Sequence, residues 1–428
     1  ELLVVSDGIT ARTGSLTARY NRFAPWRTID GERLAPKGVG ELSVLMRGLF
    51  EKRRLLDYIR NFVLWEADGA KLVKKNAGYH QYLAVNRAVM ETLRASGAEA
   101  PKEAPLVVPR RASRTDGRKS DAPPAMLGDR HVGVVWHTQG SGKSISMVFY
   151  VGKLVQASGM KNPTVVVLTD RNDLDGQLFA QFAAASDIVG EPVQAESRED
   201  LKTKLEVASG GVVFTTIQKF GTDAGEHYPL LSARGNIVVV ADEAHRSQYA
   251  TIKGFARNLR DALPNASFLG FTGTPIDFSD RNTRTVFGGY IDVYPVRQAV
   301  EDGATVPIFY ESRVVRLDLP GEHKDLVDAD FDQVTEGAED SLKNKLKTRW
   351  AKLEAIVGAE ERVNDVAADL VKHYERRGQD IQGKAMIVTM SRRIAVLLYD
   401  AIIKLRPSWH SDDDDKGAIK IVMTGSAS

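Results

Sequence analysis

Residues 132–144 read Val-Gly-Val-Val-Trp-His-Thr-Gln-Gly-Ser-Gly-Lys-Ser, an apolar run that leads into a glycine-rich turn. The run predicts a buried strand, and residues 145–157 after the turn are compatible with a helix. The backbone amides of a glycine-rich loop and of a helix N-terminus both point at bound phosphate. We therefore expect Lys143 to neutralise the terminal phosphates of ATP and Ser144 to hold Mg²⁺.

The loop matches the general phosphate-binding pattern incompletely, because His137 stands where that pattern has its first glycine. Gly140 and Gly142 remain at positions where the backbone must approach phosphate closely. Taken alone, the Gly-Lys-Ser part fits an ordinary helix-opening turn equally well. The residues that we expect to contact the nucleotide in this loop are Thr138, Gly140, Ser141, Gly142, Lys143 and Ser144.

Two acidic residues follow another apolar run, residues 237–241, which predicts a strand buried on both faces. Asp242 then lies at the carboxyl end of that strand, where open α/β sheets place their ligands. We expect Asp242 to hold the metal and Glu243 to activate the attacking water, with Lys143 as the third catalytic residue. An Asp-Glu pair after a strand also commonly caps a helix. A third segment, Thr272-Gly-Thr-Pro275, ends another apolar run, and the joint occurrence of three such strand ends favours a catalytic site.

Apolar runs alternate with helix-compatible segments from residue 131 to about residue 310. This alternation predicts an α/β fold with a parallel, doubly wound sheet and right-handed crossovers. A helix near residues 363–377 and a strand at 385–389 are expected to begin a second α/β domain, which residues 419–423 continue. The predicted strands of the first domain are residues 132–136, 165–168, 212–215, 237–241, 268–271 and 306–310.

The N-terminal part begins with an apolar run that predicts a strand, and residues 8–15 are hairpin-like. A second helix is expected over residues 76–95, and an exposed linker over residues 100–127. Before them, a helical pattern places six apolar residues on one face: Leu45, Leu49, Leu56, Ile59, Phe62 and Val63.

The composition restricts the class of protein without identifying it. The 428 residues are 43% apolar and 27% charged, which is typical of a globular protein with two or three cores. The formal net charge of +2 gives no global signature of polyanion binding, so any nucleic-acid contact must come from a local cleft. There is no cysteine, which excludes disulfides and thiolate zinc sites and fits a reducing cytoplasm.

The chain shows no signal peptide and no apolar stretch of membrane-spanning length, so no membrane partner is expected. Both ends interrupt apolar runs, residues 2–5 and 419–423. Neither position is typical of a domain border, so we expect the sequence to be a piece of a longer chain.

The segments Thr138 to Ser144, Asp242-Glu-Ala-His245 and Thr272-Gly-Thr-Pro275 resemble motifs I, II and III of the superfamily-2 helicases and translocases. More narrowly, the chain resembles the restriction (motor) subunit of type I restriction-modification enzymes over nearly its whole length. The segments that carry this narrower resemblance are residues 135–144, 168–174, 214–220, 242–248, 305–311 and 384–390.

The resemblance implies RecA-like domains that use ATP and Mg²⁺ to move double-stranded DNA before it is cleaved. The specificity and methyltransferase subunits of the same complex would then be protein partners. It also implies five parts: the rear of an endonuclease domain (1–68), an adenine-motif helix and linker (69–130), a first RecA-like domain (131–312), a connector (313–362) and the start of a second RecA-like domain (363–428). The nuclease centre is then expected before residue 1, and the arginine finger after residue 428.

Roles for further residues follow from the same resemblance. Gln81 lies in a segment like the glutamine motif upstream of motif I, and its amide has the bidentate geometry that reads adenine, although most glutamines are simply exposed. His245, Thr272 and Thr274 would couple the nucleotide site to domain movement. Candidate DNA contacts through phosphates are Asp170, Arg171, Thr215, Thr216 and Gln218; a capping aspartate with a nearby arginine explains the first two equally well.

Two other functions remain open on the sequence. One is a helicase of the same superfamily that separates DNA or RNA strands. The other is a non-catalytic assembly fragment, which the missing motifs of the second domain favour.

Overall fold

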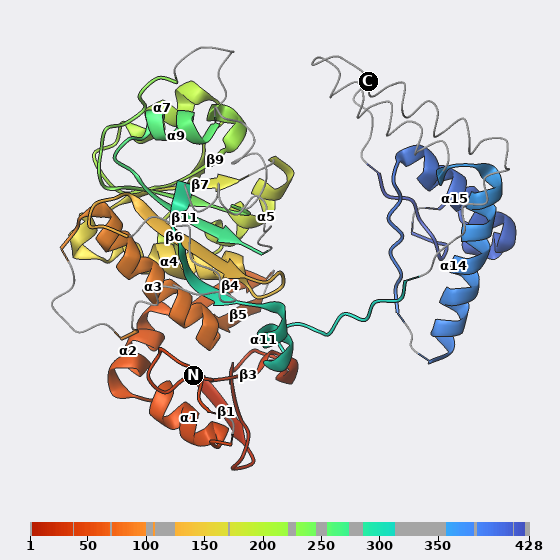
Figure 1. The fold of residues 1–428 in the computed structure, drawn as a ribbon, viewed down its shortest axis with the longest axis horizontal. Coiled ribbons are helices and arrows are strands. Elements are labelled where there is room, and N and C mark those ends of the chain that lie inside the picture. The colour runs from red at the N-terminus through yellow and green to blue at the C-terminus, as the bar shows by residue number, and fades with distance from the viewer. Residues whose placement is uncertain are drawn as a thin grey trace, which may run out of the picture. The chain divides into compact units, whose positions relative to one another are not determined.

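The computed structural model describes residues 2–36, 38–68, 71–99, 106–107, 125–169, 172–220, 228–244, 255–273, 286–312, 357–380, 383–413 and 415–423. The chain divides into two compact units, Glu1–Ile308 and Phe309–Ser428. Figure 1 shows the two units, and each is described by itself below.

A seven-stranded sheet forms the centre of the first unit, and all of its strand pairs are parallel. The spatial order of the strands is β12-β6-β11-β10-β7-β9-β8. This sheet confirms the predicted α/β class. The strands are β6 (His131–His137), β7 (Thr164–Thr169), β8 (Pro192–Gln194), β9 (Val212–Thr216), β10 (Ile237–Ala241), β11 (Ser267–Thr272) and β12 (Tyr290–Tyr294).

Both faces of the central strands are buried, because successive residues of these strands enter different hydrophobic cores. In β10, Val238 and Val240 pack into one core, whereas Ile237, Val239 and Ala241 pack into the other. This burial explains the continuous runs of Val and Ile that the sequence shows. Helices α3 (Tyr79–Ser96), α4 (Lys143–Val155) and α5 (Asn172–Ala183) supply the first core, and α7 (Arg198–Leu205) and α9 (Phe255–Ala262) supply the second (Figure 1).

The expected strand at residues 306–310 is wrong. Residues 306–312 have no regular secondary structure, and Phe309 and Tyr310 are at least nine-tenths exposed. Pro307 interrupts the apolar run, and proline has no N–H with which to join a hydrogen-bonded ladder. The sheet instead ends at β12, which pairs with β6 and was not predicted from the sequence.

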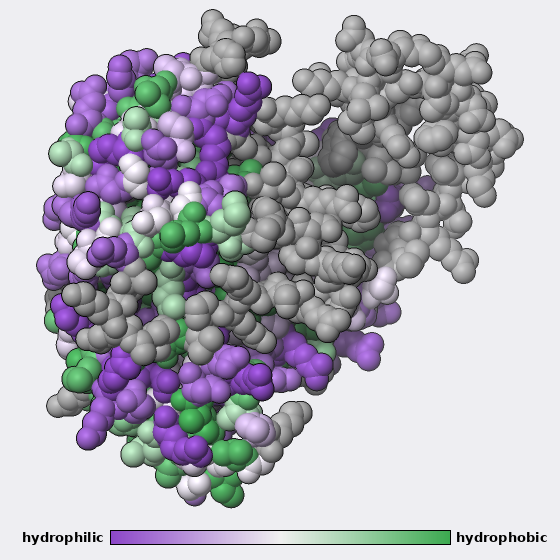
Figure 2. Space-filling model, turned by 60° about the vertical axis from the view of Figure 1, so that its left-hand side comes forward, coloured by the Kyte–Doolittle hydropathy of each residue, from purple (hydrophilic) through white to green (hydrophobic). Residues whose placement is uncertain are grey.

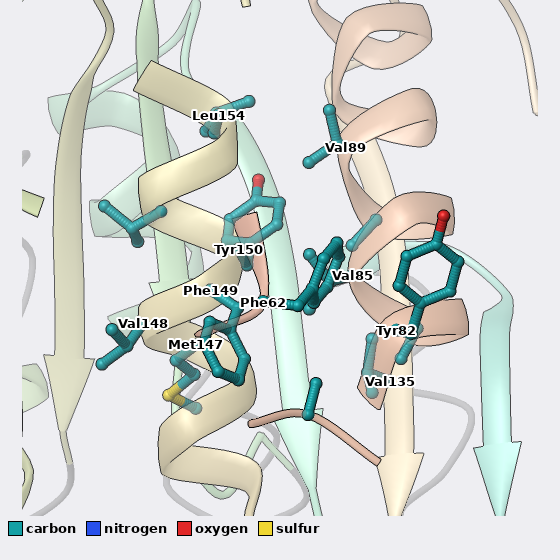
Figure 3. Close-up of a cluster of buried hydrophobic side chains, with 14 of the residues drawn as sticks. Phe62, Tyr82, Val85, Val89, Val135, Met147, Val148, Phe149, Tyr150 and Leu154 are labelled. Carbon is teal, nitrogen blue, oxygen red and sulfur yellow. The ribbon is translucent and has the colours of Figure 1, made fainter. Parts of the chain in front are cut away.

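Helix α4 is anchored against α3 by large side chains. Figure 3 shows Phe62 between the two helices. The centroid of its ring lies 4.6 Å from that of Tyr82 in α3 and 5.6 Å from that of Phe149 in α4. The hydroxyls of Tyr150 and Thr92 lie 2.7 Å apart in a hydrogen bond. Burial of each such side chain contributes about 1.5–3 kcal/mol, so the helix after the glycine-rich loop has a rigid support.

The predicted hairpin is confirmed, since β1 and β2 pair antiparallel, but the single helix expected through residues 45–63 is wrong. The Glu51 carboxylate accepts hydrogen bonds from the amides of Arg53 and Arg54 and starts a second helix. That helix buries Arg54 and Tyr58, and it leaves Leu56 and Ile59 exposed. The elements of this part are β1 (Leu2–Ser6), β2 (Ala11–Ser15), η1 (Tyr20–Arg22), β3 (Ala24–Pro25), α1 (Glu41–Gly48), α2 (Lys52–Asn61), β4 (Val63–Asp68) and β5 (Lys71–Asn76).

Four short elements complete the described part of the first unit: η2 (Ser158–Met160), α6 (Ser186–Val189), η3 (Ile217–Phe220) and α11 (Val296–Glu301). Among the described residues, no helix is long and apolar enough to cross a membrane. Figure 2 shows hydrophilic and hydrophobic residues mixed over the coloured part of the face in view.

The second unit contains α14 (Glu360–Asp380), α15 (Arg392–Leu405) and η6 (Pro407–Trp409), and α14 confirms the helix predicted near residues 363–377. The two long helices share a core that includes Val371 and Leu398. The strand expected at 385–389 is wrong, because this segment lacks regular structure, and residues 419–423, which were expected to continue the second domain, lack it too. A strand needs a hydrogen-bonded neighbour, and among the described residues of this unit no segment pairs with either.

Candidate nucleotide-binding site

The loop between β6 and α4 turns through two glycines whose backbone is left-handed. Gly140 and Gly142 have φ angles of +80° and +83°, a left-handed conformation that glycine adopts without strain. A Cβ on Gly142 would lie 2.8 Å from Nε2 of Gln81. The Ser141 hydroxyl donates to the Thr138 carbonyl at 2.5 Å and closes the turn. The N-terminus of α4 follows at Lys143, so its unpaired amides begin where the loop ends.

The acidic pair predicted from the sequence lies beside this loop. Oε1 of Glu243 lies 4.0 Å from Nζ of Lys143. The amide of Glu243 donates to Oδ1 of Asp242 at 2.9 Å, which fixes the Asp242 carboxylate against the backbone of the turn. The amide of Asp242 donates to the Leu168 carbonyl, so the turn is attached directly to the sheet.

The segment after β11 meets the same two groups. A Cβ on Gly273 would lie 2.8 Å from Nζ of Lys143 and 2.9 Å from Cγ of Gln139. The Gly273 amide donates to Oε2 of Glu243 at 3.5 Å. Because β11 lies between β6 and β10, the three motif segments meet where these neighbouring parallel strands end, at the carboxyl end of the sheet.

Gln81 is buried against the loop, not exposed on the surface. Its Oε1 accepts from the Gly78 amide at 2.8 Å, which caps α3. Its Nε2 donates to the Gly142 carbonyl at 3.0 Å and to the Ser146 hydroxyl at 3.3 Å. A contact with adenine stays a prediction, and it requires the amide to exchange some of these bonds.

Two histidines beside the loop were missed as site residues. The Nε2 of His80 lies 3.0 Å from the Ser141 carbonyl. The Nε2 of His137 lies 2.7 Å from Oδ2 of Asp292. The other oxygen of this carboxylate, Oδ1, pairs with Arg87. The departure of His137 from the glycine of the general pattern was the one sequence signal that could have revealed this cluster.

Charge and burial set the protonation of this cluster. Burial, together with the neighbouring His137, lowers the pKa of His80 to about 4, so its ring is neutral near pH 7. Burial alone would raise the pKa of Asp292, but the hydrogen bond from His137 and the charge of Arg87 hold it below its ordinary value. Asp292 is therefore ionised and able to orient the ring of His137.

The remaining candidates divide into described and undescribed residues. Thr215 and Thr216 end β9 and are buried, Gln218 is exposed in η3, and Thr272 ends β11. The Thr215 hydroxyl has no hydrogen-bond partner among the described residues. The other candidates lie outside the described residues: Asp170, Arg171, His245 and Thr274.

The loop and the acidic turn suit Mg²⁺ bound together with a nucleotide. The described residues contain no group of three or more His, Asp or Glu that could hold a metal. Mg²⁺ in nucleotide sites is usually held by one or two carboxylates, a hydroxyl and the phosphates themselves, so such a group is not needed. Ser144, in the first turn of α4, and Asp242 supply that set of donors.

Comparison with known proteins gives a family match. The SWI2/SNF2 ATPase family model matches residues 80–344, more than half of the chain. The chain is 46% identical to the endonuclease subunit of the type I restriction enzyme HindI of Haemophilus influenzae, over all of the chain and 39% of that relative. It is 38% identical to a protein assigned as such a subunit in Methanocaldococcus jannaschii, over all of the chain and 38% of that relative. The chain thus spans about two fifths of the length of these relatives.

Solved structures include a fragment assigned as an HsdR subunit of a type I restriction enzyme from Vibrio vulnificus. The match has a TM-score of 0.42 and 15% identity, and it covers 95% of this chain and 58% of that chain.

Proposed function

The chain belongs to the SWI2/SNF2 ATPase family and is homologous over its whole length to endonuclease subunits of type I restriction enzymes. From this premise we propose that it uses ATP hydrolysis to move along double-stranded DNA. The observation that supports the proposal most is the meeting of Lys143, Glu243 and Gly273 from three separate strand ends. The RecA-like sheet places all three at its carboxyl edge, where α/β folds bind ligands.

In this proposal, ATP binds with its phosphates over Gly140 and Gly142, and Lys143 neutralises the charge of the terminal phosphates. Ser144 and Asp242 would hold Mg²⁺, which supplies further charge neutralisation at the phosphates when it is bound. Glu243 lies within reach of the same region and would accept a proton from the attacking water. Hydrolysis then breaks the bond to the terminal phosphate and yields ADP and inorganic phosphate.

The DNA track would lie along the strand ends that carry hydroxyls. Thr215, whose buried hydroxyl has no partner among the described residues, and Thr216 end a strand on the same edge of the sheet as the acidic turn. Contacts of these hydroxyls and of Arg171 with a phosphate backbone would carry no sequence preference. For Thr215 and Thr216, which are buried, such contacts would require the end of β9 to become exposed when DNA binds. We propose that other subunits, for specificity and methylation, select the DNA site.

The test is an ATPase assay of the intact subunit with and without duplex DNA, using Lys143→Ala as the variant. We expect duplex DNA to stimulate the wild type, and we expect the variant to lose nucleotide affinity because the charge beside the phosphates is gone. A suitable control is Lys202→Ala, because this lysine is exposed on α7, which connects β8 and β9 at the other end of the strand order from β6. Normal DNA-stimulated activity in Lys143→Ala would show that the site is elsewhere.

A second candidate function is strand separation by a helicase, which the same motifs would support. Displacement of a third strand from a triplex measures movement along a duplex, and release of a labelled strand measures unwinding. Unwinding without triplex displacement would favour the helicase. A wild type that shows no ATPase activity under any condition would favour the non-catalytic assembly fragment.

A further inference from the structure

Two consecutive side chains of α3 hold two consecutive carbonyls of the phosphate loop. His80 contacts the carbonyl of Ser141 at 3.0 Å, and Gln81 donates to the carbonyl of Gly142 at 3.0 Å. In a planar trans peptide the C=O and the following N–H point in opposite directions. The two bonds therefore turn the amides of Gly142 and Lys143 away from α3, and successive amides turned the same way form a nest for an anion.

The bond from His80 has a defined direction. A carbonyl only accepts hydrogen bonds, so the neutral ring carries its hydrogen on Nε2. Burial disfavours the charged ring, as the lowered pKa of His80 indicates. Near neutral pH, His80 is thus a fixed donor to the loop that adds no positive charge next to the phosphates.

The ring of His80 is itself held in place by stacking. It lies parallel to the ring of Tyr294, with an interplanar angle of 4° and centroids 4.0 Å apart. The hydroxyls of Tyr294 and Tyr79 both donate to Oδ2 of Asp302, at 2.9 Å and 2.8 Å. Oδ1 of Asp302 accepts from Nε of Arg27 at 2.9 Å, which extends the network to the N-terminal part of the chain.

We propose that His80 is a positioning residue that sets the Ser141–Gly142 peptide for phosphate binding, with its ring oriented by Tyr294. This inference rests on the proposed function, because it assumes that the loop binds the phosphates of a nucleotide. It assigns His80 no contact with the reacting atoms. The hydrogen bonds to Asp302 fix Tyr294, and Tyr294 in turn fixes the His80 ring that donates to the loop.

The test measures ADP affinity by calorimetry on the purified chain, with thermal unfolding in parallel. His80→Phe keeps an aromatic ring for the stack and removes the donor, so we expect ADP affinity to fall about tenfold, as the loss of one hydrogen bond predicts. His80→Gln restores a donor at a similar reach and should recover most of the affinity. His131→Gln, at the opposite end of β6, is the matched control and should bind ADP as the wild type does.

Tyr294→Leu tests the same proposal without changing His80. It removes the stacked ring but keeps the Tyr294 backbone carbonyl that accepts from Thr138. We expect it to weaken ADP binding, and we expect the double variant with His80→Phe to be no weaker than His80→Phe alone, because both changes disturb one donor.

Failure of the proposed function can be distinguished from failure of the role proposed for His80. If the wild type and Lys143→Ala bind ADP equally poorly, the proposed function is wrong and this inference falls with it. If the wild type binds ADP and Lys143→Ala does not, wild-type affinity in His80→Phe would overturn the inference alone. Equal losses in His80→Phe and His80→Gln would also overturn it, since only packing of the imidazole ring would then matter.

Discussion

Glu243 occupies a backbone conformation that few residues other than glycine adopt. Its φ angle is +47°, and its amide is bonded to the preceding aspartate. Holding a glutamate in the left-handed region costs about 1–2 kcal/mol. The sheet compensates for this strain, because the amides of Asp242 and Ala244 donate to carbonyls of β7 and β11. The carboxylate thereby reaches the glycine-rich loop from a turn that is fixed to the sheet, as the proposed activation of water by Glu243 would require.

Glu243→Gln should separate nucleotide binding from hydrolysis. Glutamine has the same size and pays the same backbone cost, so we expect unchanged stability and nearly unchanged ATP affinity. Hydrolysis should fall by roughly 10²–10⁴, the usual contribution of a positioned base. DNA-stimulated turnover and ATP affinity of the intact enzyme measure the two effects. Turnover like that of the wild type would exclude Glu243 as the base.

At the scale of elements, close packing explains one glycine that helix propensity disfavours. Gly48 is the last residue of α1, and a Cβ there would overlap the Thr28 carbonyl and the Trp26 indole. These two groups are joined by a hydrogen bond of 2.7 Å. The end of α1 can therefore approach this turn only where there is no side chain. Gly176 in α5 is the opposite case, because a Cβ there would meet nothing within 4 Å.

The same substitution should thus have opposite effects at these two glycines. We expect Gly48→Ala to lower the free energy of unfolding by about 1–3 kcal/mol through overpacking. Gly176→Ala should raise it by roughly 0.5–1 kcal/mol, because alanine favours the helix and restricts the unfolded chain. Urea unfolding of the chain measures both changes. Stabilisation by Gly48→Ala would contradict the packing described for α1.

Elements could be predicted from the sequence where burial alone determines them. The strands from β6 to β11 that carry continuous apolar runs were predicted, because burial on both faces leaves that pattern. The helix break at Glu51 was not predicted. The apolar residues continue at helical spacing through this position, but the Glu51 side chain caps a new helix there. The candidate site followed the same rule. Lys143 and Glu243 lie in local motifs, whereas the role of His80 depends on the stack with Tyr294, which is more than 200 residues away in the chain.

For the whole chain, the charge balance bears on the proposed binding of DNA. The chain has 58 Lys and Arg against 56 Asp and Glu. Several arginines of the first unit are already paired inside it, including Arg27 with Asp302, Arg87 with Asp292 and Arg94 with Asp129. The proposed attraction to DNA would therefore come from a local group of cations, and each of them should contribute measurably.

Arg171 is the cation that the sequence places at the end of β7, although it lies outside the described residues. If it contacts a phosphate, it releases about one counterion on binding. In the intact enzyme, Arg171→Ala should then weaken DNA-stimulated ATPase equally on unrelated duplex sequences. It should also reduce the slope of log affinity against log salt by about 1. Titrations on two duplexes over a range of salt concentrations measure both quantities. Loss on one sequence only would identify Arg171 as a base contact, and stimulation by single strands but not by duplex would support the helicase over the translocase.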